Sequence, residues 1–267
     1  MPLVSVITTF YNSEEHIYDC IKSAQQITSD YHFEHILVND GSSDKSLKII
    51  QDAKLKNIKI IGDQHIGRGA ALNLGLATAR GDYICILDSD DLINAAWINF
   101  FLENHEAFNP RAVFFGKVCT DLDTFKSYKR PEFILHKILN PLKLLFHNPI
   151  CHSGSIFSKG SVMEINGYSK SLNSQLDWDL WLRLSFADVE FIFFNYLAAY
   201  KRIHMNQSFE HSKHFTYTMR GVNLQLNAVM RHKFIYVIPV LIFSFCRVIW
   251  SLVPRKIRTS DIFHMLR

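Results

Sequence analysis

Short apolar runs alternate with segments of mixed polarity through the N-terminal part of the chain. The runs that have the length and bounding turns of strands are residues 3–9, 33–38, 57–61 and 83–87. Residues 45–53 and 69–79 are predicted helices, and a third helix is expected to follow a Ser13 cap, with Glu14 and Glu15 in its first turn. Strands separated by helices of this length require right-handed crossovers, so we expect an α/β fold with a mostly parallel sheet.

Polar clusters follow two of the predicted strands. Asn39 and Asp40 come directly after the second strand, and residues 88–91 place three carboxylates in four positions after the fourth. Parallel sheets bind ligands at the carboxyl ends of their strands, so these clusters predict a nucleotide site. The glycines of residues 67–75 do not fit GxGxxG, because Leu72 holds the place of the third glycine, and no GxxxxGK[ST] segment occurs. A dinucleotide-binding motif and a P-loop are therefore disfavoured.

The carboxylates at residues 88–91 raise an electrostatic question. Residues 84–87 read as a buried strand, and strand side chains alternate between faces, so Asp88 and Asp90 are expected to point to the same side. Like charges this close repel one another, and a cation between them would relieve the repulsion. The pattern therefore predicts a cation at the end of this strand.

Composition narrows the class of protein. With 267 residues, 48% of them apolar and 20% charged, the chain can form a globular core in one large or two small domains. The net charge of +4 is too small to indicate nucleic-acid binding, but it suits phosphorylated ligands or an anionic membrane surface. The five cysteines form no CxxC pair, which favours a reducing compartment, and the N-terminus reads as a strand instead of a signal peptide. We expect a cytoplasmic protein.

Five segments of the chain together carry a resemblance to a known family. They are TTFYN at 8–12, VNDGSSD at 38–44, IGRGAALNLGLATARGDYICILDSDD at 66–91, DWDLWLRL at 177–184 and RIHMNQS at 202–208. In order and spacing they resemble the inverting glycosyltransferases of family two, over residues 3–210. The resemblance implies the A-type glycosyltransferase fold, a Rossmann-like, mostly parallel sheet flanked by helices. It divides the catalytic domain into a nucleotide-sugar-binding half at 1–110 and an acceptor-binding half at 111–210.

The resemblance assigns nucleotide-sugar binding to residues near the strand ends. An aspartate at the place of Asp40 hydrogen-bonds the nucleotide base in the family, and the backbone around Phe10 and Tyr11 forms the pocket wall. A turn with an Asx cap is the alternative for Asp40, although capping suits Asp44 better, and a surface role is an equal alternative for Arg68. The full set that the resemblance implies is Phe10, Tyr11, Asn12, Asp40, Arg68, Asp88, Ser89 and Arg202.

The resemblance also implies a metal site. Asp88 and Asp90 match the family's DxD motif, in which Mg²⁺ or Mn²⁺ bridges carboxylate and diphosphate, and His204 stands where the family has a ligand for the metal or the diphosphate. Hard divalent cations prefer oxygen ligands and take one or two carboxylates besides phosphates. A solvated acidic loop that caps a helix is the alternative. For His152, a lone histidine, a structural role is expected.

The catalytic base falls on the DWDLWLRL segment. The resemblance places it at Asp177, but Leu176 stands where the family has a glutamate, so a supporting carboxylate is missing. Asp179 and Arg183 form a ready i,i+4 pair, for which a structural role is favoured. Inverting transfer needs one base, which takes the proton of the acceptor hydroxyl, and one cation at the leaving diphosphate.

These features predict an inverting, metal-dependent glycosyltransferase that moves a sugar from a nucleotide-diphosphate sugar, with UDP the expected nucleotide, to a saccharide or lipid-linked acceptor. The pattern indicates polysaccharide biosynthesis at the cell envelope. The alternative is a non-catalytic sugar-nucleotide-binding or membrane-associated assembly protein of the same fold, which Leu176 supports. A sugar-nucleotide pyrophosphorylase is disfavoured, because the glycine-rich basic loop is absent after residues 3–9.

Beyond the catalytic segments, residues 211–267 are predicted to form amphipathic and apolar helices. Apolar residues at 215, 219, 222, 226 and 229 recur at helical spacing. The run at 234–253 is long enough to span a bilayer, but Pro239 and Arg247 interrupt it. A helix that lies in the membrane interface is therefore preferred over a spanning helix and over a core or dimer helix.

Two further features favour the interfacial helix. Near-helical spacing gives it a narrow polar stripe of Tyr236, Ser244, Arg247 and Ser251. Basic residues flank it on both sides and can reach anionic headgroups: Arg231, Lys233, Arg255, Lys256 and Arg258. The expected location is the cytoplasm, peripheral on the inner face of the cell membrane, where a lipid-linked acceptor would be accessible.

Overall fold

The computed structural model describes residues 4–27, 33–172, 174–203, 214–232 and 234–252. The chain forms two compact units. The first comprises residues 1–144 and 148–202, and the second comprises residues 145–147 and 203–267. Apart from residues 145–147, the part of the expected catalytic domain up to residue 202 falls in the first unit.

The N-terminal half of the first unit has the predicted alternation of strands and helices. Its parallel strands lie in the order β3-β2-β1-β4. Their bounds are β1 Val4–Phe10, β2 Phe33–Asn39, β3 Ile58–Ile61 and β4 Tyr83–Ile86. The connecting helices are α1 Ile17–Ala24, α2 Ser46–Asp52 and α3 Arg68–Thr78. The predicted strands and helices are confirmed here, with shifts of one to a few residues at their ends.

The C-terminal half of this unit makes the sheet mixed, where the sequence predicted a mostly parallel one. β8 pairs antiparallel with β4, and the order continues β8-β6-β9-β5, with β7 antiparallel on β9. The added strands are β5 Leu92–Ile93, β6 Val113–Cys119, β7 His136–Ile138, β8 Ile156–Ser158 and β9 Phe191–Tyr200. The helices are α4 Ala95–Asn104, α5 Leu122–Ser127, α6 Lys159–Glu164 and α7 Leu176–Phe186, with 3-10 turns at His105–Ala107 and Pro141–Leu145.

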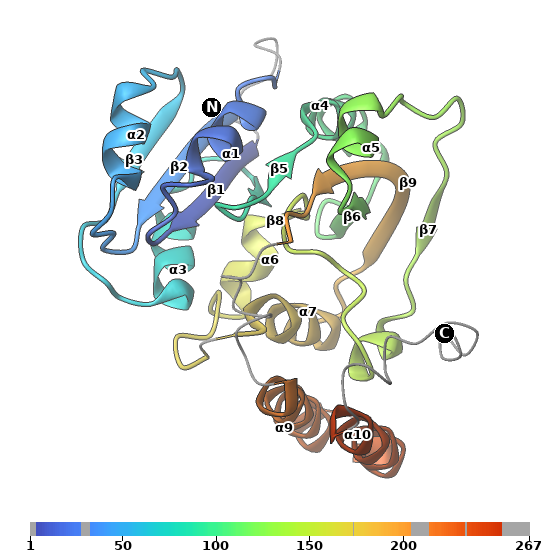
Figure 1. The fold of residues 1–267 in the computed structure, drawn as a ribbon. Coiled ribbons are helices and arrows are strands. Elements are labelled where there is room, and N and C mark those ends of the chain that lie inside the picture. Colours follow the sequence, from blue (N-terminus) through green and yellow to red (C-terminus); the bar gives the residue numbers. More distant parts are fainter. Residues whose placement is uncertain (1–3, 28–32, 173, 204–213, 233, 253–267) are drawn as a thin grey trace. The chain divides into compact units, whose positions relative to one another are not determined.

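The N-terminal half of the sheet is covered on both faces (Figure 1). On one face, Ile17 and Ile21 of α1 and Ile50 of α2 pack with Phe10 and Leu37. On the opposite face lies α3, close enough that a Cβ on its Gly75 would come within 2.6 Å of the Ile7 side chain. A buried parallel sheet of this kind leaves its carboxyl ends as the place where polar side chains gather.

The C-terminal half is held by an aromatic core. The Trp97 ring is fully buried and lies 5.9 Å from Phe100, 5.6 Å from Phe194 and 5.9 Å from Tyr196, measured between ring centroids. Its indole N–H donates to the carbonyl of Gly154 at 2.8 Å. Such rings bury large apolar areas, and the hydrogen bond ties α4 to the loop before β8.

The expected Ser13 cap is wrong. The helix begins at Ile17, and the Ser13 side chain contacts the Tyr11 carbonyl and the Ser89 hydroxyl instead. Glu14 is engaged by the next helix, because its carboxylate accepts the N–H of Lys45 at 2.9 Å. The loop after β1 is therefore used to brace the start of α2, where Asp44 accepts the N–H of Ser46.

The second unit contains α9 His214–His232, the 3-10 turn Phe234–Tyr236 and α10 Val237–Leu252. The amphipathic α9 is confirmed, with Val222 and Val229 buried. Two residues of the expected polar stripe of α10 face the inside of this unit: Ser244 is buried, and Arg247 donates to Gln225 of α9 at 3.1 Å. Gln225 in turn donates to the carbonyls of Leu145 and Phe146. Among the helices of the described ranges, none has both the length and the hydropathy needed to cross a bilayer.

A buried histidine in the first unit makes stability depend on pH. His35 of β2 has no exposed surface, and its Nε2 lies 3.0 Å from the Thr8 hydroxyl of β1. Burial lowers the pKa of His35 from 6.5 to about 3. The neutral ring therefore stabilises the fold above pH 6.5, and this stability is lost as the pH falls toward 3, because only the unfolded chain takes up the proton.

We expect the free energy of unfolding to fall by about 2 kcal/mol more in the wild type than in His35→Gln between pH 7 and pH 5. Glutamine keeps a polar partner for Thr8 but does not titrate in this range. Urea denaturation of both proteins at the two pH values measures the difference. Equal pH dependence in the two proteins would show that His35 is not the responsible group.

Candidate active site

The loops after β1, β2 and β4 meet at one edge of the sheet. Phe10 contributes only its backbone, because its side chain is buried in the core and its carbonyl accepts the N–H of Asp40 at 2.9 Å. The Tyr11 ring is half exposed and lies 4.7 Å from the ring of His65. The His65 ring is also exposed, and its Nδ1 lies 3.3 Å from Asp40, so both rings lie near this carboxylate.

Asp40 is fixed in place by the start of the segment that leads into α3. Its Oδ1 accepts the N–H groups of Ile66 and Gly67 at 2.7 and 3.0 Å, and its Oδ2 lies 3.3 Å from Nδ1 of His65. The alternative of a local Asx cap is not what holds this carboxylate, because its partners come from a distant loop. Asp44 is the residue that caps.

Asn12 and Ser89 brace the loops that surround this surface. Asn12 has a positive φ of 50°, and its Oδ1 accepts the N–H of Ser43 at 2.8 Å. The Ser89 hydroxyl lies 2.9 Å from that of Ser13. Both residues thus connect the loop after β1 to its neighbours, as their place near the predicted site requires.

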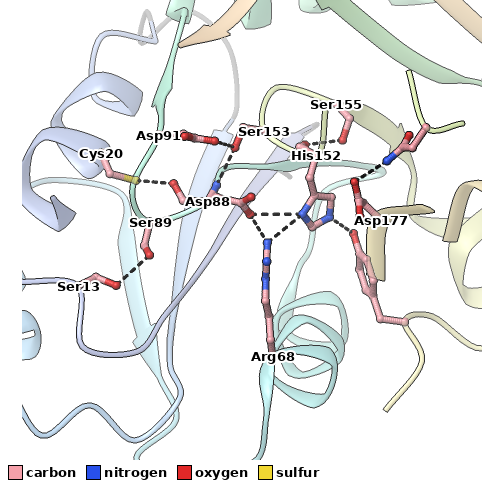
Figure 2. Close-up of polar contacts among 12 residues, drawn as sticks. Ser13, Cys20, Arg68, Asp88, Ser89, Asp91, His152, Ser153, Ser155 and Asp177 are labelled. Atoms are coloured by element: carbon pink, nitrogen blue, oxygen red, sulfur yellow. Dashed lines mark hydrogen bonds and ion pairs between the residues drawn. The ribbon is translucent and has the colours of Figure 1, made fainter. Parts of the chain in front are cut away.

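Asp88 is the centre of the polar network (Figure 2). Its Oδ1 accepts from the Arg68 guanidinium at 2.6 Å and lies 3.3 Å from Nδ1 of His152. Burial alone would raise the pKa of Asp88, but the charge of Arg68 and the contact with His152 lower it. The same pairing raises the pKa of Arg68. Arg68 therefore acts as a counter-ion and is not merely a surface residue.

We call residues 88–91 the acidic turn. β4 ends at Ile86, and the Asp91 N–H donates to the Asp88 carbonyl at 3.0 Å, so these residues form a turn. The expectation that strand alternation aligns Asp88 with Asp90 is therefore wrong, because the strand stops two residues too early.

The repulsion between the carboxylates of the acidic turn is also reduced by the protonation of Asp91. This carboxyl is buried, and its Oδ2 accepts from the Ser153 hydroxyl at 2.6 Å. Burial and the charges of Asp88 and Asp90 raise the pKa of Asp91 to about 8. A neutral Asp91 and an Asp88 paired with Arg68 leave less net charge in the turn than its sequence indicates.

Two cations of β9's C-terminal end lie against the acidic turn. The Arg202 N–H donates to Asp91 Oδ1, and its Nε donates to the Asp90 carbonyl, both at 2.9 Å. Arg202 therefore braces the turn. For Lys201, burial alone would lower the pKa, but Cys151 and the carboxylates of the acidic turn and of Asp177 raise it.

The donor atoms at this edge suit a hard cation. The acidic turn offers three carboxylates and the Ser89 hydroxyl, which are oxygen ligands of the kind that Mg²⁺ and Mn²⁺ prefer, and such ions take one or two carboxylates besides phosphates. Across the described ranges, no group of three or more His, Cys, Asp and Glu side chains is arranged to hold a metal without other ligands. In donor type, the carboxylates of the acidic turn fit a hard divalent cation. His204 lies outside the described residues.

The expected base lies at the start of α7. Asp177 is in the first turn, and its Oδ2 accepts from the Asn148 amide at 2.7 Å. Leu176 is buried beside α3, with its Cδ2 3.3 Å from where a Cβ on Gly69 would lie. An amide from the loop before β8 therefore supports the aspartate, in a sequence that lacks the family's glutamate.

Asp179 and Arg183 form the predicted structural pair. The Arg183 Nε donates to Asp179 Oδ2 at 2.8 Å. Arg183 also donates to the carbonyls of Ile165 and Gly167, so the pair anchors the loop before α7.

Comparison with known proteins agrees with this arrangement. The family model described as "Glycosyl transferase family 2" matches residues 5–165, which is more than half of the chain. The chain belongs to glycosyl transferase family 2. This family membership covers the sheet edge with Asp40, Arg68 and the acidic turn.

Individual relatives of this family 2 chain are similar over parts of their length. An uncharacterized glycosyltransferase of Haemophilus influenzae is 40% identical over 39% of this chain and 44% of its own. The teichoic acid poly(glycerol phosphate) polymerase of Staphylococcus epidermidis is 30% identical over 68% of this chain and 26% of its own. The chain thus spans less than half the length of these curated relatives.

A solved structure shares the fold. The crystal structure of S. aureus TarS 1–349 in complex with UDP-GlcNAc matches with a TM-score of 0.68 and 19% identity, covering 99% of this chain and 76% of that one. At this identity the likeness establishes the fold alone.

Sequence reasoning missed two residues of this family 2 site. Asn148 carried no signal, because it stands alone in a loop with no motif around it. His152 was expected to be structural, yet it contacts both Asp88 and Arg68. The pairing of β8 with β4 brings His152 to the acidic turn, and Asn148, in the same loop, reaches Asp177. No local sequence pattern predicts that pairing.

Proposed function

We propose that the chain is an inverting glycosyltransferase that moves a sugar from a nucleotide-diphosphate sugar to a saccharide or lipid-linked acceptor. One observation carries the proposal: Arg68 is paired with Asp88 of the acidic turn, and the nearby charge of Asp177 also raises the pKa of Arg68. The carboxylate expected to act as base and the residues expected to bind the nucleotide sugar thus share one neighbourhood. The likeness to a UDP-GlcNAc complex supports UDP as the nucleotide.

In the proposed reaction, Asp177 takes the proton of an acceptor hydroxyl as that oxygen attacks the anomeric carbon. A new carbon–oxygen bond forms on one face of the sugar, and the bond to the nucleoside diphosphate breaks on the other face. Asn148 holds the Asp177 carboxylate by one oxygen, which leaves the other available to the hydroxyl. Asp40 and the Tyr11 ring face the nucleotide.

The residues that would hold a divalent cation are Asp90 and Asp88, with His204 as a further ligand to the metal or the diphosphate. Bound there, Mg²⁺ or Mn²⁺ would neutralise the charge that develops on the leaving diphosphate. Arg68 contacts the acidic turn through Asp88, and Arg202 contacts it through Asp91 and the Asp90 carbonyl.

A non-catalytic sugar-nucleotide-binding protein is the second candidate function. Leu176 favours it, because a buried leucine replaces the carboxylate expected beside the base. Asn148 argues against it, since a hydrogen bond at 2.7 Å orients Asp177 without that carboxylate. The names of relatives such as the teichoic acid polymerase and the chondroitin synthase of Escherichia coli support a role in polysaccharide biosynthesis at the cell envelope.

We also propose that the second unit attaches the protein to the inner face of the cell membrane. One face of α10 consists of large apolar side chains that are each at least 49% exposed: Ile238, Ile242, Phe245, Ile249 and Leu252. They recur at helical spacing on the side away from Gln225, which holds Arg247. Arg231 is exposed at the end of α9, and the sequence adds basic residues after α10, which suits an anionic lipid surface.

UDP binding is expected to depend on a divalent cation through the acidic turn. Asp90→Ala should abolish the dependence of UDP affinity on Mn²⁺, because the cation loses an oxygen ligand while the core is untouched. Titration calorimetry with Mn²⁺ and with chelator measures this, and Asp82→Ala, an exposed carboxylate before β4, is the matched control. Equal UDP affinity of the wild type in both conditions would contradict the metal assignment.

Turnover is expected to depend on Asp177. Asp177→Asn keeps the shape and removes the proton acceptor, so UDP binding should persist while sugar transfer falls by roughly 10²–10⁴-fold. Asp179→Asn, in the same helix, is the control and should retain most of the activity. The assay follows acceptor mass over a panel of nucleotide sugars. More than about half of wild-type turnover in Asp177→Asn would move the base elsewhere.

Membrane attachment is expected to require the exposed face of α10. The full chain should float with vesicles that contain phosphatidylglycerol. The double variant Ile242→Glu with Phe245→Glu should stay at the bottom, because burying two carboxylates in the membrane interface costs free energy. Phe133→Glu with Leu135→Glu, on exposed residues of the first unit, is the matched control and should still float. A wild type that stays at the bottom would overturn the attachment.

A further inference from the structure

His152 is buried between the acidic turn and the loop that precedes α7. Its side chain is 5% exposed, and its ring lies 5.6 Å from the ring of Tyr168 and 6.3 Å from that of Trp181, edge to face in both cases. The surroundings thus hold the plane of the imidazole, and both of its nitrogens meet polar groups.

The two nitrogens of His152 face different partners. Nδ1 lies 3.3 Å from Asp88 Oδ1 and also 3.3 Å from Nη2 of Arg68, and Nε2 lies 2.8 Å from the Tyr168 hydroxyl. A neutral imidazole donates from one nitrogen and accepts at the other. Asp88 can only accept and Arg68 can only donate, and the Arg68 guanidinium already donates to Asp88 Oδ1 at 2.6 Å. With Arg68 engaged in this way, Nδ1–H donates to Asp88 and Nε2 accepts from the Tyr168 hydroxyl.

Tyr168 is itself a fixed point. It is 2% exposed, its N–H donates to Asn73 Oδ1, and its carbonyl accepts from the Asn73 amide, both at 2.8 Å. Arg183 of α7 holds the neighbouring carbonyl of Gly167 at 2.7 Å. The Tyr168 hydroxyl is therefore presented to His152 by α3 and α7 together.

These contacts close a ring through α3. Arg68 at the start of this helix donates to Asp88, and Asn73, later in the same helix, holds Tyr168. His152 completes the path, because its Nε2 lies beside the Tyr168 hydroxyl and its Nδ1 beside Asp88. Figure 2 shows His152 together with Asp88 and Arg68. Without its Nδ1–H, the Asp88 carboxylate would keep Arg68 as a partner but lose the contact that fixes its rotation.

We infer that His152 is a positioning residue of the nucleotide-sugar site: oriented by Tyr168, it donates Nδ1–H to Asp88 and holds that carboxylate and Arg68 in the geometry that receives the nucleotide diphosphate. The inference rests on the proposed function. His152 is separated from the ligand by Asp88, so its effect is on affinity.

Two amide substitutions separate the nitrogens of His152. Asparagine places an amide N–H near the position of Nδ1, so His152→Asn keeps the bond to Asp88 and loses the partner of Tyr168. Glutamine places its amide near Nε2, so His152→Gln keeps Tyr168 and loses Asp88. Tyr168→Phe is the third variant, which removes only the hydroxyl that sets the tautomer.

The measurements are UDP affinity by calorimetry with Mn²⁺ and the thermal midpoint, both on the full chain. His152→Gln should weaken UDP binding about tenfold with little change in midpoint, because a hydrogen bond to a charged group is lost. His152→Asn should bind UDP as the wild type does but melt at a lower temperature, because the buried Tyr168 hydroxyl loses its partner. Tyr168→Phe should weaken binding in the same direction as His152→Gln, by a smaller factor.

A purely structural histidine gives a different result, in which affinity falls in proportion to the midpoint and His152→Asn is the weaker binder. That outcome, or wild-type affinity in both His152→Gln and Tyr168→Phe, would overturn the inference while leaving the proposed function intact. A wild type that does not bind UDP would overturn the proposed function, and the inference with it.

Discussion

The acidic turn concentrates negative charge, and the surrounding residues of the site are arranged so as to stabilise it. Three carboxylates follow one buried strand within four residues, and burial makes their mutual repulsion stronger than it would be in water. Arg68 pairs with Asp88, Ser153 donates to Asp91, and Arg202 holds the backbone of the turn. Each of these groups comes from a different part of the chain. The turn can therefore exist only when α3, the segment before β8 and the end of β9 are all in place.

The antiparallel pairing of β8 with β4 is what makes this possible. It places residues 152–155 beside the end of β4, so that His152 reaches Asp88 and Ser153 reaches Asp91. Asn148, in the same loop, reaches Asp177. A parallel addition at this edge would need a long crossover and would carry those residues to the other end of the strand. The mixed sheet thus joins the half that carries Asp40 and the acidic turn to the half that carries Asp177.

The sequence predicted the elements that depend on local residue patterns. It did not predict the contacts that depend on pairing between strands far apart in the chain. The four parallel strands and the helices between them follow from runs of apolar residues, and the polar strand ends located Asp40 and Asp88. Arg68 was added by the resemblance to the family, with a surface role as an equal alternative. The three-residue β8 has no such pattern, and neither Asn148 nor His152 stands in a motif. Ser13 was predicted as a helix cap because Glu14 and Glu15 follow it. In the structure, Glu14 instead accepts the N–H of Lys45 at the start of α2, a contact between loops that sequence spacing does not predict.

The same concentration of negative charge bears on Leu176, which precedes Asp177, the proposed base. A glutamate at this position would be buried beside α3 and would add a negative charge close to Asp177 and the acidic turn, where Arg68 already balances Asp88. An apolar side chain avoids that desolvation cost and packs against the start of α3 instead. Asn148 then supplies orientation by a neutral hydrogen bond, which fixes the Asp177 carboxylate without a further charge. On the proposed function, the departure from the family's pattern changes how the proposed base is held, while Asp177 lies at the start of α7.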